Sequence, residues 1–208
     1  MKILSELSKC GFSLVRREDG VALKDVRSMI ERLHPLKTTF GRLHPLRRAD
    51  AKPNTLSAAH GLGELPPHSD GAHLPIPPRY FVLFVPRPRS AATLIYRLED
   101  RLCGIETDAE RAIFYVRDRH SLFPTPFKTR SSEGEAVYRF NPDIMSPAND
   151  SAERVFNALT EKPLDPTVRV DWSENIAVFI DNWRMLHGRE AARQSDSSII
   201  RCSIWMDL

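Results

Sequence analysis

The sequence has few cysteines and no run of apolar residues long enough to cross a membrane. Its three cysteines, Cys10, Cys103 and Cys202, form no CxxC pair among the 208 residues, which excludes a disulfide framework and a zinc knuckle. The longest aliphatic runs fall far short of the roughly 20 residues that a membrane helix needs. Glu6 and Lys9 interrupt the N-terminal stretch that would be apolar in a secretory signal. We therefore expect free thiols, a cytoplasmic location and no membrane partner.

Charge of one sign is not in excess either. Thirty Lys and Arg against 27 Asp and Glu leave a net charge of +3, and the basic residues are scattered rather than gathered in a stripe. We therefore expect no nucleic-acid partner. With 41% hydrophobic and 27% charged residues, the composition is that of a globular domain, which at this length needs no metal to hold it together. A metal in this protein would accordingly serve chemistry.

The spacing of apolar residues predicts few helices and many short strands. Apolar residues recur every three or four positions over 23–33 and 151–161, which predicts two amphipathic helices. Asp150 is the expected N-cap of the second helix, and the spacing of Thr107 and Glu110 predicts that a short third helix begins there. The remaining segments read mostly as strands. These are residues 11–15, 80–85, 92–98, 113–116, 136–140, 167–171, 176–180 and 199–206.

Short strands with irregular links favour a β sandwich or barrel. Residues 1–208 are predicted to form one domain, with residues 1–55 as an N-terminal strand and helix flank and residues 56–208 as the core. Seven prolines between Pro66 and Pro88 exclude a helix in that stretch. Any chemistry within it therefore rests on strands and loops.

Three segments carry candidate functional residues. In LPPHSDGAHLP, His68 and Asp70 are two positions apart, so on an extended chain both side chains point to one face as metal ligands would. The plain alternative is a polar turn after two prolines. His187 follows the apolar strand at 176–180 and is placed either to complete a three-ligand face or to be an ordinary loop histidine. Arg201 stands among apolar residues, where a guanidinium needs an anionic partner, either a bound carboxylate or an internal acid.

Together these segments resemble the iron(II)- and 2-oxoglutarate-dependent oxygenases of the taurine dioxygenase-like family, especially the branch related to clavaminate synthase and γ-butyrobetaine hydroxylase. The resemblance rests on HSD at 68–70, a threonine-containing strand at 92–96, DNWRMLHGR at 181–189, and Arg201 at the distance that this branch uses. It covers residues 56–206. The fold it implies is mainly β with flanking helices, a double-stranded β-helix (jelly roll) sandwich.

The resemblance also implies a role for each matched residue. His68, Asp70 and His187 would bind iron(II) and leave positions for 2-oxoglutarate and O2. Arg201 would bind the far carboxylate of 2-oxoglutarate, with the Thr93 hydroxyl beside it. The implied reaction hydroxylates an unactivated C–H bond of a small polar metabolite, an amino acid or a carboxylate-bearing derivative, and releases succinate and CO2. Because related halogenases lack the carboxylate, Asp70 indicates oxygenation rather than halogen transfer.

Other charged residues are open to more than one interpretation. Arg139 lies between aromatic residues, where it would either face the pocket and meet a substrate carboxylate or stack at the surface. Arg189, close to His187, would bind an anion or form a salt bridge near the pocket mouth. His120 is predicted to be a loop residue rather than a metal ligand.

Two other functions stay open from the sequence. A jelly-roll metalloenzyme that uses zinc or another divalent ion for hydrolysis or isomerisation would keep the metal ligands but would not need Arg201. A non-catalytic jelly-roll binding module would use the same histidines and aspartate structurally and would show no dependence on a cosubstrate. A small-molecule substrate is the expected partner in the leading interpretation, and no oligomeric state is predicted.

Overall fold

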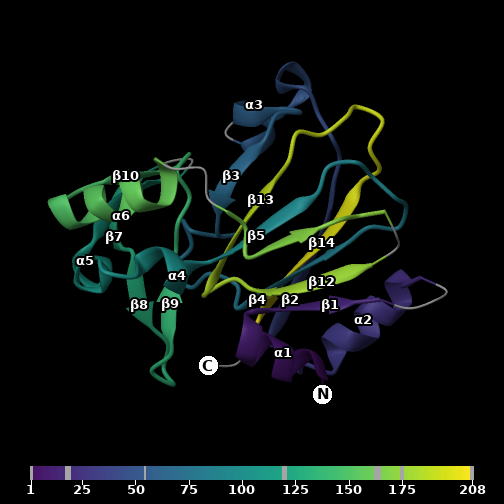
Figure 1. Ribbon diagram of the computed structural model, residues 1–208, viewed down its shortest axis with the longest axis horizontal. Coiled ribbons are helices and arrows are strands. Elements are labelled where there is room, and N and C mark those ends of the chain that lie inside the picture. The colour runs from purple at the N-terminus through teal and green to yellow at the C-terminus, as the bar shows by residue number, and fades with distance from the viewer. Residues whose placement is uncertain are drawn as a thin grey trace.

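The chain folds into a sandwich of two antiparallel sheets with helices on the outer faces (Figure 1). The computed structural model describes residues 2–16, 20–53, 55–118, 121–161, 165–173 and 176–206. Within these ranges all strand pairings are antiparallel. The predicted fold class, mainly β with flanking helices, is confirmed.

The larger sheet has five strands in the order β1-β12-β4-β14-β2, and the smaller has four in the order β11-β5-β13-β3. The strands of the larger sheet are β1 (Phe12–Val15), β12 (Ala177–Asp181), β4 (Tyr80–Phe84), β14 (Ile199–Trp205) and β2 (Lys37–Leu43). Those of the smaller sheet are β11 (Val168–Val170), β5 (Thr93–Arg97), β13 (Met185–Arg189) and β3 (Leu65–His68). Strands β1 and β2 come from the first 55 residues, so the N-terminal segment contributes directly to the sandwich.

Apolar side chains from both sheets fill the space between them. Phe81 and Val178 of the larger sheet and Ile95 and Met185 of the smaller one belong to one buried cluster, together with Trp172. Alternate residues of each strand point inward, as expected for two sheets packed face to face. This core fixes the position of β13, which carries His187.

Two helices cover the outer face of the larger sheet (Figure 1). They are α1 (Lys2–Cys10) and α2 (Leu23–Glu31). Leu7 and Ile30 of these helices pack in one cluster with Val82, Phe179 and Ile204 of the sheet. Two further short elements, η1 (Arg48–Asp50) and α3 (Leu56–His60), lie between β2 and β3 in the chain.

A third group of elements packs beside the smaller sheet (Figure 1). It consists of a three-stranded sheet, a two-stranded hairpin and three helices: β10 (Met145–Pro147), β6 (Ile113–Arg117), β7 (Leu122–Pro126), β8 (Lys128–Arg130), β9 (Ala136–Tyr138), α4 (Leu98–Leu102), α5 (Glu106–Arg111) and α6 (Asp150–Thr160). Tyr96 and Leu186 of the smaller sheet share a buried cluster with Phe114, Phe140 and Val155 of this group. The smaller sheet is therefore covered on both faces.

The helices and strands predicted from the sequence are all present, but two helix starts differ. The N-cap of α6 is Asn149 rather than Asp150, because the Asn149 side chain accepts a hydrogen bond from the Ala152 amide at 2.9 Å. Helix α5 has Ile105 as its N-cap, so Thr107 lies inside the helix. The sequence did not predict six strands and three helices, namely β2, β3, β7, β8, β10, β13, α1, α3 and α4.

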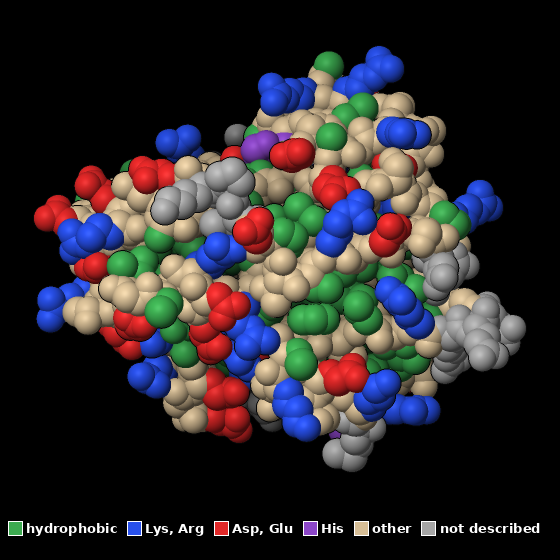
Figure 2. Space-filling view, in the orientation of Figure 1, with side chains coloured by type: hydrophobic (Ala, Val, Ile, Leu, Met, Phe, Trp, Pro, Cys, Tyr) green, Lys and Arg blue, Asp and Glu red, His purple; other side chains and the backbone are tan. Residues whose placement is uncertain are grey.

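The structure also bears on the cysteines, the membrane-spanning potential of the helices and the distribution of charge. All three cysteines are free. Within the described ranges, none of the helices combines the length and the apolar character that crossing a membrane requires. On the face shown in Figure 2, Lys and Arg side chains are interspersed with Asp and Glu, in keeping with the small net charge of +3.

Candidate metal centre

Strands β3 and β13 place two histidines side by side. His187 pairs with His68 across the strands, and their ring centroids are 4.2 Å apart. Gly188 permits this approach, because a Cβ at that position would lie 2.7 Å from the carbonyl oxygen of Leu65. The Nδ1 atom of His68 donates to the carbonyl oxygen of Pro66 at 2.8 Å, which leaves its Nε2 unprotonated and able to bind a metal.

Asp70 lies two residues beyond the end of β3, in a turn rather than in the strand. The Ser69 amide donates to the carbonyl of Phe140 at 2.7 Å, and the Ser69 hydroxyl accepts from the Phe140 amide at 2.9 Å. On the other side, the Asp70 amide donates to Oδ1 of Asn182 at 2.8 Å, and Nδ2 of Asn182 donates to the Asp70 carbonyl at 3.0 Å. The backbone that carries the Asp70 carboxylate is therefore held from two directions.

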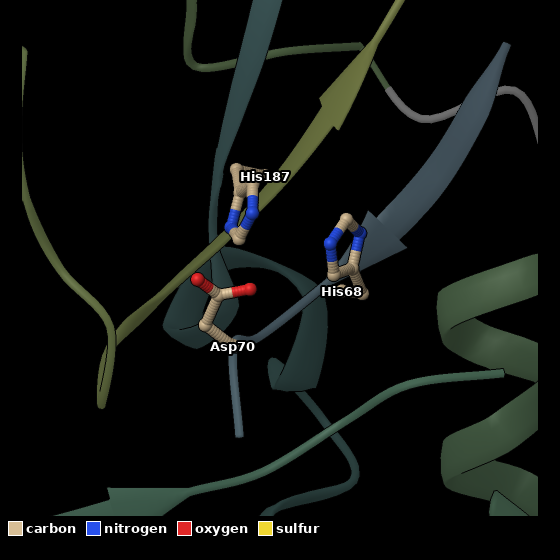
Figure 3. Close-up of side chains that lie close together, drawn as sticks. All are labelled: His68, Asp70 and His187. Atoms are coloured by element: carbon tan, nitrogen blue, oxygen red, sulfur yellow. The ribbon is translucent and has the colours of Figure 1, made fainter. Parts of the chain in front are cut away.

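The side chains of His68, Asp70 and His187 point toward one another (Figure 3). One ligand atom from each lies within 4.8 Å of the other two, and the three residues are 3%, 8% and 7% exposed. The buried Nδ1 atom of His187 has no hydrogen-bond partner among the described residues. Two imidazole nitrogens and one carboxylate oxygen on one side of a cavity fit a single metal ion, in the two-histidine, one-carboxylate arrangement that suits iron(II).

Burial also sets the protonation of the two histidines. It lowers the pKa of His187 well below its ordinary value, and the nearby His68 and Arg201 act in the same direction. Burial likewise lowers the pKa of His68, although Asp70 attracts the protonated form. Both imidazoles are therefore neutral near pH 7, which is the form that binds a metal.

A cavity of about 730 Å³ opens beside the three side chains. His68, Asp70 and Arg201 line it together with parts of α3, the turn after Asp70 and residues 141–144. Sites for small-molecule ligands commonly have volumes of about 300–1,000 Å³. The cavity is therefore large enough for a cosubstrate and a small metabolite.

Strand β14 carries Arg201 into this cavity. Its Nη1 atom lies 3.1 Å from Oδ2 and 3.3 Å from Oδ1 of Asp70. Asp70 is thus the internal acid that the sequence analysis left open as one of two partners for Arg201. The Arg201 side chain is still 38% exposed, so the guanidinium retains donors for a second carboxylate in the cavity.

The other residues singled out from the sequence do not line this cavity. The Thr93 hydroxyl accepts a hydrogen bond from the indole nitrogen of Trp172 at 3.1 Å. Arg139 is buried and donates to backbone carbonyls in residues 74–75. Arg189 donates to the carbonyl of Gly61 at 2.9 Å. His120 lies outside the described residues.

Sequence reasoning missed Asn182 and the pair formed by His60 and Asp143. Asn182 is fully buried and holds the Asp70 backbone through its side-chain amide. The signal for it was the DNW triplet directly after an apolar strand. Asp143 lines the cavity, and its Oδ2 atom lies 2.8 Å from Nε2 of His60, which joins α3 to the segment after β9. No local sequence signal pairs these two residues, which are 83 positions apart.

Solved structures of iron-dependent oxygenases share the fold. One is the non-heme iron oxygenase OrfP in complex with Fe, succinate and (3S)-hydroxy-L-Arg, with 17% identity and a TM-score of 0.69 over 99% of this chain and 78% of that one. PvcB from Pseudomonas aeruginosa has 16% identity and a TM-score of 0.65 over 98% and 78%. An asparagine oxygenase in complex with Fe(II), 2S,3S-3-hydroxyasparagine and succinate has 16% identity and a TM-score of 0.59 over 71% and 51%. This chain thus spans only about half of the asparagine oxygenase.

The sequence comparison identifies the family. No match was found among curated proteins. The profile of the taurine catabolism dioxygenase TauD, TfdA family matches residues 88–203, which include His187 and Arg201 and make up more than half of the chain. The sandwich is accordingly the jelly roll that the sequence predicted, and the chain belongs to the taurine catabolism dioxygenase TauD, TfdA family.

Proposed function

We propose that this chain is an iron(II)- and 2-oxoglutarate-dependent dioxygenase that hydroxylates an unactivated C–H bond of a small polar metabolite. The observation that carries the proposal is the convergence of His68, Asp70 and His187 within 4.8 Å at a cavity that Arg201 also lines. In this proposal the three converging side chains bind iron(II). Residues 1–208 act as one domain, because strands from the first 55 residues complete the larger sheet.

The side chains around the metal ligands would keep them in place. The carbonyl of Pro66 orients the His68 ring through its Nδ1–H, and Asn182 holds the backbone of Asp70. Burial keeps both imidazoles neutral, so no proton has to leave before a metal binds. When bound with 2-oxoglutarate and O2, iron(II) supplies the oxidation of the C–H bond, with release of succinate and CO2.

Arg201 is the proposed ligand of the far carboxylate of 2-oxoglutarate. A guanidinium binds a carboxylate through two parallel charge-assisted hydrogen bonds, and this one is partly exposed in the cavity. A place for the Thr93 hydroxyl beside the cosubstrate stays a prediction, because this side chain accepts a hydrogen bond from Trp172 and does not line the cavity. Arg139 and Arg189 are not carried forward as substrate ligands, because both donate to backbone carbonyls and neither lines the cavity.

The proposed substrate class is an amino acid or a carboxylate-bearing derivative. It is supported by the fold shared with OrfP bound to (3S)-hydroxy-L-Arg and with an asparagine oxygenase bound to 3-hydroxyasparagine. The placement in the branch of clavaminate synthase and γ-butyrobetaine hydroxylase stays a prediction.

The test begins with anaerobic addition of iron(II) and 2-oxoglutarate. We expect the weak visible charge-transfer band of a chelated keto acid, and, in air, consumption of 2-oxoglutarate with formation of succinate. A panel of amino acids and their derivatives should then accelerate this turnover for some members. Activity with zinc in the absence of the band would favour the hydrolase alternative. Absence of metal and 2-oxoglutarate binding would leave a non-catalytic binding module.

A further inference from the structure

The segment directly after the metal-ligating turn is rich in proline. Residues 74–78 read LPIPP, and the three prolines have no N–H with which to join a sheet. Their carbonyls still need hydrogen-bond donors where they are buried. Leu74 and Pro78 line the cavity that contains His68 and Asp70. How this segment is held therefore affects the shape of the proposed active site.

Side chains supply the donors for the first three carbonyls. Nη1 of Arg139 donates to the carbonyl of Leu74 at 2.8 Å, and Nη2 donates to that of Pro75 at 3.2 Å. The indole nitrogen of Trp205 donates to the carbonyl of Ile76 at 3.2 Å. These donors come from the end of β9 and the end of β14, which are far apart in the sequence.

The next two carbonyls are held in the same way. The indole nitrogen of Trp183 donates to the carbonyl of Pro77 at 3.2 Å, and Nδ2 of Asn182 donates to that of Pro78 at 2.9 Å. Because the same Asn182 amide also binds the backbone of Asp70, it connects the last residue of the segment to the turn that carries the candidate metal ligand. Five consecutive carbonyls thus all accept hydrogen bonds from side chains.

Arg139 is unusual among these donors because it carries a charge into the interior. The residue is only 4% exposed, and its Nε atom is buried with no hydrogen-bond partner among the described residues. Burial lowers the pKa of Arg139. A buried guanidinium is unfavourable unless its donors are used. Hydrogen bonding to the carbonyls of residues 74–75 explains why Arg139 is buried at this position.

We propose that residues 74–78 form a preformed wall of the cavity, held through their carbonyls, and that Arg139 is the positioning residue that keeps this wall and the Asp70 turn in place before any ligand binds. Because the wall is already ordered, ligand binding does not lose the conformational entropy that ordering it would cost. The consequence for catalysis rests on the proposed dioxygenase function. The rigidity of the wall does not.

Two variants and one matched control test the wall. Arg139→Met keeps the apolar stem and removes the donors, and Trp205→Phe removes one N–H while retaining an aromatic ring for Lys37, whose Nζ lies 5.0 Å from the indole. The control is Arg97→Met. Like Arg139, Arg97 has a buried Nε without a partner among the described residues and donates to a backbone carbonyl, that of Cys10 at 3.2 Å, away from the cavity.

The first readout is hydrogen exchange in the ligand-free protein at the amide of Leu74, which donates to the carbonyl of Gly71 at 2.8 Å. We expect exchange to be faster by about fivefold in Trp205→Phe, the effect of one lost hydrogen bond, and by more in Arg139→Met. The second readout is the dissociation constant for Co(II), a probe for the metal site, which should rise about tenfold in Arg139→Met. Arg97→Met should match the wild type in both measurements.

The outcomes separate the wall from the proposed activity. Exchange at the Leu74 amide that is equal in Arg139→Met, Trp205→Phe and Arg97→Met would overturn the wall, whatever the activity. Faster exchange in the two wall variants with unchanged Co(II) affinity would overturn the positioning of Asp70. Failure of the wild type to consume 2-oxoglutarate would refute the dioxygenase function and leave the exchange result standing as the test of the wall.

Discussion

Asp70 has two kinds of neighbour: the imidazoles of His68 and His187 on one side and the guanidinium of Arg201 on the other. Asp70 is 8% exposed, and Nη1 of Arg201 lies 3.1 Å from its carboxylate. A buried charge is costly unless it is paired. Arg201 is that partner among the described residues.

Replacing Asp70 with alanine should abolish the consumption of 2-oxoglutarate and weaken metal binding strongly, because one of three ligands is lost. The folded state should change little, with Tm lowered by no more than about 4 °C, which corresponds to about 1 kcal/mol in a chain of this size. Succinate formation, Co(II) titration and thermal unfolding measure the three effects. Loss of the cooperative unfolding transition would instead assign Asp70 a structural role.

Arg201→Met should raise the KM for 2-oxoglutarate about 10- to 100-fold, because hydrogen bonds to charged groups contribute about 1.5–3 kcal/mol. The measurement is made at saturating iron(II), so that a weaker metal site does not mimic the effect. Arg154→Met is the control, since Arg154 pairs with Asp108 on the surface of α6 and α5. An unchanged KM in Arg201→Met would remove this residue from the cosubstrate site.

Asp181, at the end of β12, should make stability depend on pH. Burial raises the pKa of Asp181 to about 6, in spite of Arg79 at 3.5 Å. The pKa of Arg79 is itself raised, although burial opposes this, since Glu135 and Asp181 both attract its charge. Burial dominates the pKa of Asp181, because Arg79 also pairs with Glu135 and therefore stabilises the Asp181 carboxylate less.

The direction of this pH dependence follows from the number of protons that the folded and unfolded states bind. Between the ordinary value of 3.8 and about 6, the folded protein keeps a proton on Asp181 that the unfolded chain has released. Stability therefore falls as pH rises through this window, by on the order of 2 kcal/mol. Urea unfolding of the wild type and Asp181→Asn at pH 4 and pH 7 measures it. The wild type should lose stability relative to the variant at pH 7, and a difference that does not vary with pH would contradict the expectation.

Helix α6 shows how a helix start is fixed by more than its own sequence. The Asn149 side chain accepts from the amides of Ala152 and Ile113, at 2.9 Å and 3.3 Å, and donates to the carbonyl of Arg111 at 3.0 Å. It therefore caps the helix and ties it to β6. Asp150, a plausible cap on sequence grounds, is already the first residue of the helix.

Asn149→Ala should consequently reduce the free energy of unfolding by about 1–2 kcal/mol, as expected for loss of an N-cap. Asp150→Ala should lose no more than about 0.5–1 kcal/mol, the contribution of an acidic side chain to the helix dipole. Urea denaturation of both variants compares them directly. Equal losses of unfolding free energy in the two variants would mean that the Asn149 cap contributes no more than an acidic residue of the first turn.

Two of the strands that the sequence did not predict, β3 and β13, share a physical cause. Strand β3, LPPH, contains two prolines, and β13, MLHGR, contains a glycine and charged or polar residues. Both lack the apolar alternation that identifies a strand. They form because neighbouring β5 supplies a partner for β13, and β13 in turn supplies one for β3. The two histidines thus lie on strands that only their neighbours stabilise.

Across the entire chain, apolar clusters hold the fold without help from the metal site. One cluster lies between the two sheets, one lies under α1 and α2, and one lies between the smaller sheet and α4, α5 and α6. Each consists of apolar side chains that contact one another, and Phe81 of the cluster between the sheets also packs against the ring of His187, with ring centroids 4.3 Å apart. Folding should therefore precede metal binding.

Removing metal with a chelator should leave the protein folded, with a cooperative thermal transition and an unchanged circular dichroism spectrum. Adding Co(II) at 100 times its dissociation constant should then raise the free energy of unfolding by about 2.7 kcal/mol, the effect of a ligand that binds only the folded state. Unfolding on chelation would show instead that the metal is structural. A matched addition to Asp70→Ala should give a much smaller rise.

Apolar periodicity along the chain was enough to predict the mainly β character, the amphipathic helices α2 and α6 but not α1, and the strands that carry continuous apolar runs. Residue spacing singled out His68 and Asp70, and the apolar surroundings of Arg201 singled out that residue. The family resemblance joined these three to His187 as one expected site. Residue spacing could not predict three features of the site. They are the register of β13 against β3, the turn that places Asp70, and the hydrogen bonds from Asn182 and Arg139 to residues 70–78. Those features depend on contacts between residues at least 64 positions apart in the sequence, and such contacts leave no local periodic signal.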